Sequence, residues 1–212
     1  MSSLEILDKH SPFPFYKTIS IAFFENWPLE CKDYYCCNTV EEIERKIIDE
    51  YKNVADNECP FTILYVNKNE ELVVGSVSVC NTDIVGSKYG PWISDLWVDK
   101  NYRNLGISKT LLDNILYCAN KKLGMDKIYL WVDITSDYVV KLYEKYGFKI
   151  IEKTVYCERD IFIMVKMTWD NLINRDNLIN GDNLINGDNI ANLDSNEGLI
   201  YNQLLVNKLN KN

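Results

Sequence analysis

One segment of the chain combines a glycine, an arginine and a serine at the junction between an apolar run and a helical pattern. The apolar run is Trp92–Val98, and Arg103, Gly106 and Ser108 follow it. Amides in the first turn of a helix have no partner within the helix, and the helix dipole is positive there. Gly106 lets an anion approach the backbone, and Arg103 adds a positive charge. The segment predicts a phosphate site, although an ordinary strand-to-helix connection would also fit it.

Two better-known phosphate motifs do not fit this segment. A dinucleotide fingerprint needs three spaced glycines, and only Gly106 is present. The Gly-Lys-Ser/Thr of a nucleotide P-loop is also missing. The ligand of this predicted anion site therefore has to be inferred from the elements around it.

Strand-like and helix-like patterns interleave around the segment. Four residues, 67–70, separate two β-rich runs and predict a hairpin, and Thr39 caps an acidic helix start. This order predicts an α/β fold with a mixed sheet. The predicted strands are 5–7, 61–66, 72–79, 92–98, 128–132, 148–151 and 161–167. The predicted helices are 13–27, one from residue 40, 108–122 and 136–146.

Two signatures at a defined spacing resemble one enzyme family. The run VDKNYRNLGISKTLL at 98–112 resembles the acetyl-CoA motif of the GNAT N-acetyltransferase superfamily, and KLYEKYGFK at 141–149 resembles its second signature. Residues 26–28 and 90–98 also resemble one branch of the family. The resemblance covers residues 1–168. It implies an α/β GNAT fold, with a mostly antiparallel twisted sheet of about six or seven strands flanked by about four helices.

The resemblance also implies which residues bind acetyl-CoA. Backbone groups of the strand would hold the pantetheine arm like an added strand, and the loop amides would hold the pyrophosphate. Asn104 replaces a glycine common in the family but tolerates positive φ. Ser136 replaces an asparagine that often contacts the cofactor. The implied set is Leu96, Trp97, Val98, Arg103, Asn104, Leu105, Gly106, Ile107, Ser108 and Ser136.

Two side chains are the candidate catalytic residues. The resemblance implies that Tyr143 protonates the leaving thiol. A general base or a desolvated site is needed because a lysine-like amine, with a pKa of ~10.4, is almost entirely protonated at pH 7. We favour Asp95 as this base, acting directly or through water, although Asp95 could instead cap or pair locally. Strand alternation places Asp95 and Trp97 on one face, unless a bulge intervenes.

Composition limits the partners and the chemistry. The net charge of −8 disfavours binding to nucleic acid or an anionic membrane, and favours cationic partners. Seven cysteines without a Cys-x-x-Cys pair, and the single turn-like His10, predict no metal site. Trp27, Trp92 and the pair 34–35 are candidates for the acceptor groove or the core. No signal-like or membrane-length apolar run is evident, so we expect a cytoplasmic protein.

The composition divides the chain into three parts. Residues 1–168 are predicted to form the GNAT domain, 169–197 an Asn-rich hexad-repeat, low-complexity linker that we expect to be disordered, and 198–212 a short amphipathic helix. We expect acetyl transfer to a primary amine, either a small cationic amine or a peptide or protein amine. The alternative is a non-catalytic acyl-CoA-binding or scaffolding protein of the same fold. The sequence leaves the acceptor and the oligomeric state open.

Overall fold

A single seven-stranded sheet organises the residues that the computed structural model describes, which are 2–33, 36–52, 54–55 and 58–168. The strand order is β1-β2-β3-β4-β5-β7-β6, and every neighbouring pair is antiparallel except β4 and β5. The predicted mixed, mostly antiparallel sheet is confirmed. The strands are β1 (Ser2–Leu7), β2 (Phe61–Asn67), β3 (Leu72–Cys80), β4 (Trp92–Val98), β5 (Lys127–Asp133), β6 (Lys149–Tyr156) and β7 (Arg159–Met167).

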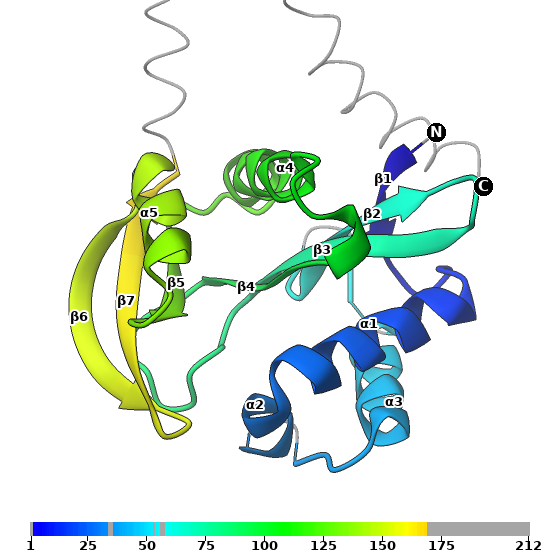
Figure 1. Ribbon diagram of the computed structural model, residues 1–212, viewed down its shortest axis with the longest axis horizontal. Helices are drawn as coiled ribbons and strands as arrows, with labels where there is room; N and C mark the ends of the chain where they lie inside the picture. Colours follow the sequence, from blue (N-terminus) through cyan, green and yellow to red (C-terminus); the bar gives the residue numbers. More distant parts are fainter. Residues whose placement is uncertain (1, 34–35, 53, 56–57, 169–212) are drawn as a thin grey trace, which may run out of the picture.

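Helices cover both faces of the sheet (Figure 1). Helices α4 (Ile107–Lys121) and α5 (Asp137–Lys145) share one apolar core with β2, β3, β5 and β7. Helices α1 (Phe13–Asn26) and α3 (Val40–Tyr51) pack with Leu64, Val66 and Val73 on the opposite face. In β3, Gly75 lets α4 approach, because a Cβ there would lie 3.1 Å from Leu111 Cδ1. The sheet is therefore fixed between two helical layers.

Local signals account for most element boundaries. The Thr39 hydroxyl accepts a hydrogen bond from the Glu42 amide at 3.3 Å, which confirms the predicted start of α3. Two short elements were not predicted, namely α2 (Pro28–Asp33) and the 3-10 helix η1 (Lys100–Tyr102). Both are too short to show a clear apolar period.

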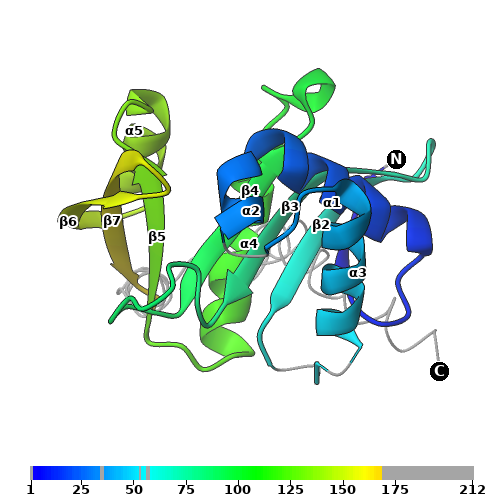
Figure 2. The same ribbon diagram turned by 90° about the horizontal axis from the view of Figure 1, so that it is seen from below.

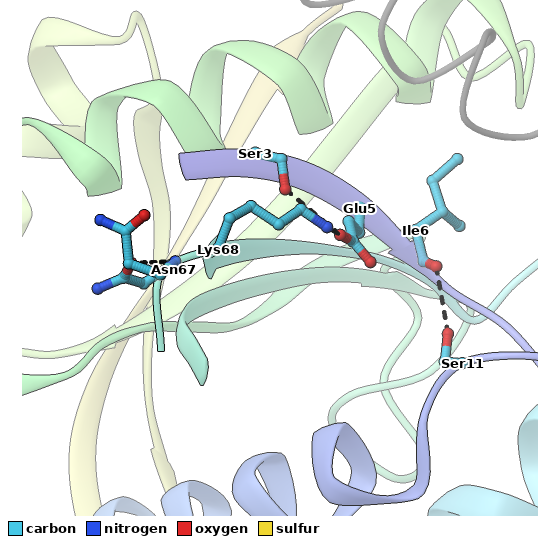
Figure 3. A network of polar contacts seen from close by, with 7 residues as sticks. Ser3, Glu5, Ile6, Ser11, Asn67 and Lys68 are labelled. Atoms are coloured by element: carbon cyan, nitrogen blue, oxygen red, sulfur yellow. Dashed lines mark hydrogen bonds and ion pairs between the residues drawn. The ribbon is translucent and has the colours of Figure 1, made fainter. Parts of the chain in front are cut away.

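The outer strand β1 is tied to β2 by polar contacts as well as by its ladder (Figure 3). Lys68 pairs with Glu5 across the two strands, and Ser3 also donates to the Glu5 carboxylate at 3.3 Å. Ser11, beyond the end of β1, donates to the Ile6 carbonyl at 3.4 Å. These contacts hold β1 at the edge of the sheet. Its neighbour β2 contributes to the candidate site.

Strands β4 and β5 diverge in the middle of the sheet. The two strands share a single bridging pair, Trp92 with Tyr129, so β4 beyond Trp92 does not pair with β5. Figures 1 and 2 show β5, β6, β7 and α5 splayed away from the β1–β4 half. Unpaired backbone groups of β4 are thus available to an extended ligand lying in the opening.

Two sequence predictions concern residues that the structure does not describe. The predicted linker at 169–197 and the predicted helix at 198–212 are among the residues not described. Within residues 2–168, apart from the gaps, no helix is long and apolar enough to cross a bilayer. His10 is exposed in a turn, where its amide donates to Asp8, as predicted for this residue.

Candidate active site

A β-bulge in β4 sets the direction of the Asp95 side chain. Ser76 pairs with Trp97 and Ser78 with Ser94, so two residues of β4, Asp95 and Leu96, stand against one residue of β3. Asp95 has a φ of 56°, a conformation that few residues other than glycine adopt. Simple strand alternation is therefore interrupted where the candidate base lies, as the possibility of a bulge had indicated.

Asp95 lines a cavity of about 320 Å³ that reaches across the divergence between β4 and β5. Residues of helices α1, α2, α3 and α5 and of all seven strands contribute to its wall. The cavity brings together four of the predicted site residues: Asp95, Leu96, Ser136 and Tyr143. Trp97 is not part of the wall, because its side chain packs against the α1 and α3 core. Val98 packs against the α4 core instead.

The cavity wall carries an excess of negative charge. Its acidic side chains are Glu30, Glu50, Asp83, Asp95 and Asp133. Its one cationic side chain, Arg159, pairs with Glu30 and lies over the Trp131 ring at 5.8 Å from the ring centre. One Glu30 oxygen is buried and has no hydrogen-bond donor among the described residues. With its carboxyls ionised, the cavity would therefore attract a cation.

Crowding of these carboxyls changes their acidity. Burial, followed by the nearby Asp95 charge, raises the pKa of Asp83 to about 8. Burial also raises the pKa of Asp95 to about 6, against hydrogen bonds from Ser94 and Ser78 that lower it. The Ser94 hydroxyl donates to Asp95 Oδ2 at 3.0 Å. A carboxyl with a pKa near 6 is mostly ionised at neutral pH and is a stronger base than an ordinary aspartate.

Tyr143 reaches the cavity from α5. The side chain is buried, and its ring meets Phe148 edge to face at 5.7 Å between centres. Burial raises its pKa above the ordinary value, so the phenol is neutral and can donate a proton or a hydrogen bond. Ser136 stands at the N-cap of α5 without a side-chain cap bond, and its side chain is among the cavity-lining groups.

The segment 103–108 lies beyond the cavity, at the start of α4. Asn104 and Gly106 both have positive φ, 64° and 78°, so Asn104 adopts the conformation predicted for it. Gly106 caps α4 without a side-chain bond, and a Cβ there would meet nothing within 4 Å. Alternating left-handed residues at an uncapped helix start form a concave array of amides that suits an anion.

Side chains of this segment have distinct roles. The Arg103 Nε donates to the Val98 carbonyl at 3.1 Å, which holds an exposed guanidinium beside the loop. Leu105 is exposed, Ser108 is half-buried, and Ile107 is buried in the α4 core. Phosphate contacts from this segment would thus come from backbone amides and from Arg103, with Ile107 anchoring the helix.

Several residues of the cavity were not predicted from the sequence. The acids Asp83 and Glu30 and the cation Arg159 lie in loops, in a short helix and at a strand start, without a motif that marks them. Ser78 and Thr62 did carry a signal, because each is a polar residue within a buried β-rich run. Of the candidate aromatics, Trp27 lines the cavity and Trp92 is a buried core residue, whereas the pair 34–35 is not described.

Within the described part of the chain, no group of three or more His, Cys, Asp or Glu side chains is arranged to hold a metal ion. The seven cysteines, all among the described residues, form no disulfide and vary in exposure.

Comparisons with known proteins agree with this geometry. Residues 15–148 match the model of the acetyltransferase (GNAT) family. The chain is 32% identical over 102 residues to the N-alpha-acetyltransferase 50 of Danio rerio, covering 48% of this chain and 58% of that protein. It is also 32% identical over 90 residues to the probable N-acetyltransferase san of Drosophila melanogaster, covering 42% of this chain and 48% of that protein. The chain thus spans about half the length of the curated relatives it matches.

Solved structures share the fold at low identity. The spermidine/spermine N-acetyltransferase SpeG from Vibrio cholerae, in mutant form, superposes with a TM-score of 0.60 at 16% identity, covering 82% of this chain and 99% of that one. A GNAT-family acetyltransferase from Streptococcus pneumoniae gives a TM-score of 0.54 at 22% identity, covering 78% and 99%. At these identities the likeness concerns the fold.

Proposed function

Since this chain belongs to the GNAT acetyltransferase family, we propose that it transfers an acetyl group from acetyl-CoA to a primary amine by direct attack on the thioester. The observation that carries the proposal is the cavity that joins Asp95, Leu96 and Tyr143 where β4 leaves β5. An acid and a base there face one space beside unpaired strand backbone. That is the arrangement a thioester and an amine need to react.

The donor half of the site would bind acetyl-CoA mainly through backbone groups. The amides at the start of α4, from Asn104 to Ser108, fit a pyrophosphate, because Asn104 and Gly106 turn them inward and no side chain caps them. Arg103 adds a charge at the edge. The pantetheine arm would run along β4 past Val98 and Leu96, so that the thioester enters the cavity near Tyr143.

Proton transfers determine the roles of the two catalytic side chains. Asp95 takes one proton from the ammonium form of the acceptor, directly or through water, and the neutral nitrogen attacks the thioester carbonyl. The carbon–sulfur bond then breaks, and the leaving thiolate receives a proton from Tyr143. The new amide loses its second ammonium proton, which restores Tyr143, and Asp95 releases its proton to solvent. The balance is one ammonium and one acetyl-CoA giving one amide, one CoA thiol and one proton.

The acceptor that best suits the cavity is a small amine with more than one positive charge. Five carboxyls line the wall, and the only cation among the lining residues is already paired. Aromatic rings between the carboxyls, including Trp27, Trp131 and Tyr156, suit the methylene segments and ammonium groups of a polyamine. By its name, SpeG of the same fold acts on spermidine, which adds to this choice. A peptide or protein α-amine is the competing acceptor within the reaction.

A thiol-release assay with acetyl-CoA tests the proposal. The panel contains propylamine, 1,4-diaminobutane, spermidine and a neutral peptide with a free α-amine. We expect kcat/KM to rise at least about tenfold from the monoamine to spermidine, since each added charge is attracted by the cavity. Preference for the neutral peptide would reassign the acceptor. Binding of CoA without thiol release on any amine would instead support the non-catalytic alternative.

A further inference from the structure

A row of three buried hydroxyl groups ends at the Asp95 carboxylate. Ser78 of β3 and Asp95 line the same cavity wall, where the Ser78 hydroxyl lowers the pKa of the Asp95 carboxyl, and the Ser78 hydroxyl lies 2.7 Å from that of Thr62 in β2. The Thr62 hydroxyl is in turn hydrogen-bonded to the phenol of Tyr51, the last residue of α3. Ser78, Thr62 and Tyr51 are all buried. The row therefore connects the candidate base, Asp95, to the helical layer of α1 and α3, on the face of the sheet opposite to α4.

We propose that Ser78, Thr62 and Tyr51 are positioning residues that hold Asp95 in the ionised, proton-accepting state required of the base. This inference rests on the proposed function, in which Asp95 takes the proton of the acceptor. None of the three hydroxyl groups needs to touch the substrate for it to hold.

The direction of the hydrogen bonds follows from the chemistry of the two ends. An ionised carboxylate can only accept, so Ser78 donates to Asp95. The Ser78 oxygen is then free to accept from Thr62, and the Thr62 oxygen to accept from Tyr51. Every donor in the row points toward Asp95.

The opposite direction is disfavoured by Tyr51. If Asp95 were protonated and donated to Ser78, the row would reverse and the phenol oxygen would accept from Thr62. The phenol hydrogen would then need another acceptor, and Thr62 is the one hydrogen-bond partner that the described residues provide. A buried donor without a partner is costly. The buried phenol thus favours the ionised form of a carboxylate three hydroxyl groups away.

Other groups around Asp95 act against ionisation or stay neutral. The like charge on Glu50 of α3 opposes the Asp95 charge, whereas Asp83, in the loop after β3, has a pKa of about 8 and is neutral near pH 6. The thiols of Cys31 in α2 and Cys80 in β3 have raised pKa values and are neutral near pH 6. Ser94 of β4 is the second donor to the Asp95 carboxylate. The hydroxyl row and Ser94 are therefore the groups that offset burial.

The test is the acidic limb of the pH profile of kcat/KM, measured with spermidine and saturating acetyl-CoA. Wild type is expected to lose activity as the pH falls through about 6, where Asp95 takes up a proton. Ser78→Ala should move this limb upward by about one pH unit, because the ionised carboxylate loses a donor. Tyr51→Phe should move it in the same direction by a smaller amount, since the row can then reverse freely.

Two variants provide the controls. Ser76→Ala removes a buried hydroxyl from the same strand, but one that donates to the Asp95 carbonyl rather than to its carboxylate. It should leave the midpoint of the limb in place. Ser78→Thr retains the hydroxyl and should restore the wild-type midpoint. A shift in Ser76→Ala as large as that in Ser78→Ala would overturn the positioning role, because a general packing effect would then explain both.

The failure of this inference is separable from that of the proposed function. Asp95→Asn should abolish the limb, and persistence of the limb in that variant would show that Asp95 is not the base. If the limb belongs to Asp95 but neither Ser78→Ala nor Tyr51→Phe moves it, only the hydroxyl row fails. A carbon-13 titration of the Asp95 carboxyl, read without substrate in the full chain, should show the same upward shift in Ser78→Ala.

Discussion

In the proposed function, the start of α4 binds the acetyl donor and the acidic cavity binds the amine acceptor. These two regions are built in opposite ways. The donor site consists of backbone from one continuous segment, in which Asn104 and Gly106 turn consecutive amides toward one point. The cavity consists of side chains from helices and strands far apart in the sequence. A backbone site depends on local conformation, whereas a side-chain site depends on the whole fold. The two should respond differently to substitution.

Apart from loss of the base, the largest effect that separates the two regions is expected from Gly106→Ala. A side chain at a φ of 78° costs about 1–3 kcal/mol, although the space around it is open. The loop should relax away from this conformation, and KM for acetyl-CoA should rise about thirtyfold with KM for the amine nearly unchanged. Steady-state kinetics with each substrate varied in turn measures both constants.

Gly124→Ala is the matched control for that variant. Gly124 also has a positive φ, 62°, and open space around its Cα, but it follows the far end of α4. Its substitution should lower stability without changing either KM. Equal increases of KM for acetyl-CoA in the two variants would remove the special role of the segment 103–108.

Tyr143→Phe is expected to lower kcat about tenfold while leaving both KM values close to wild type. The leaving thiol, with a pKa near that of cysteine at ~8.5, departs readily without full protonation, so the phenol assists the step without being essential to it. The kcat at saturation with both substrates measures this effect. Unchanged turnover would exclude Tyr143 as the acid.

Asp83→Asn should weaken the use of a charged amine in the cavity and leave the donor site unaffected. At pH 9, where Asp83 is ionised because its pKa is about 8, removal of this charge from the wall should reduce kcat/KM for spermidine about fivefold and for propylamine hardly at all. Asp160→Asn is the control, because Asp160 is exposed and pairs with Lys153 outside the cavity. Equal losses for the two amines would show that Asp83 does not select for charge.

The last effect concerns stability without substrate, and it does not depend on binding at either region. The pKa of Asp83, about 8 in the folded chain, exceeds its unfolded value of ~3.9, so the folded state holds the proton more tightly. This stabilising contribution is present below pH 4 and is lost as the pH rises toward 8. Asp83→Asn should therefore raise the free energy of unfolding by several kcal/mol at pH 8, because the two pKa values differ by about four units and each unit is worth ~1.4 kcal/mol, and leave it unchanged at pH 4. Urea denaturation at the two pH values measures the difference.

The same contrast explains what the sequence could predict. The conformation of the segment 103–108 was predictable because it depends on consecutive residues, and the positive φ of Asn104 followed from residue type. The order of strands and helices followed from apolar periodicity for the same reason. Asp95 was identified as a candidate, but its direction depends on a bulge that arises from pairing with β3.

The cavity could not be predicted, because its residues meet only in the folded chain. Glu30 and Arg159 form an ion pair across 129 positions of the sequence. The raised pKa of Asp83 requires both burial and the approach of Asp95. The spacing of residues in the sequence predicts neither this ion pair nor the raised pKa of Asp83. Ser78 and Thr62 were the exception, as polar residues in otherwise apolar strands.

We propose that the cavity performs acetyl transfer with Asp95 as its base, and that the donor site at the start of α4 binds CoA independently of Asp95. The most direct test is Asp95→Asn, measured for N-acetylated spermidine by mass spectrometry and for CoA binding by calorimetry. The account predicts that product formation falls by a factor of about 10²–10⁴ while the CoA affinity stays within about twofold of wild type. Full turnover in Asp95→Asn would contradict it.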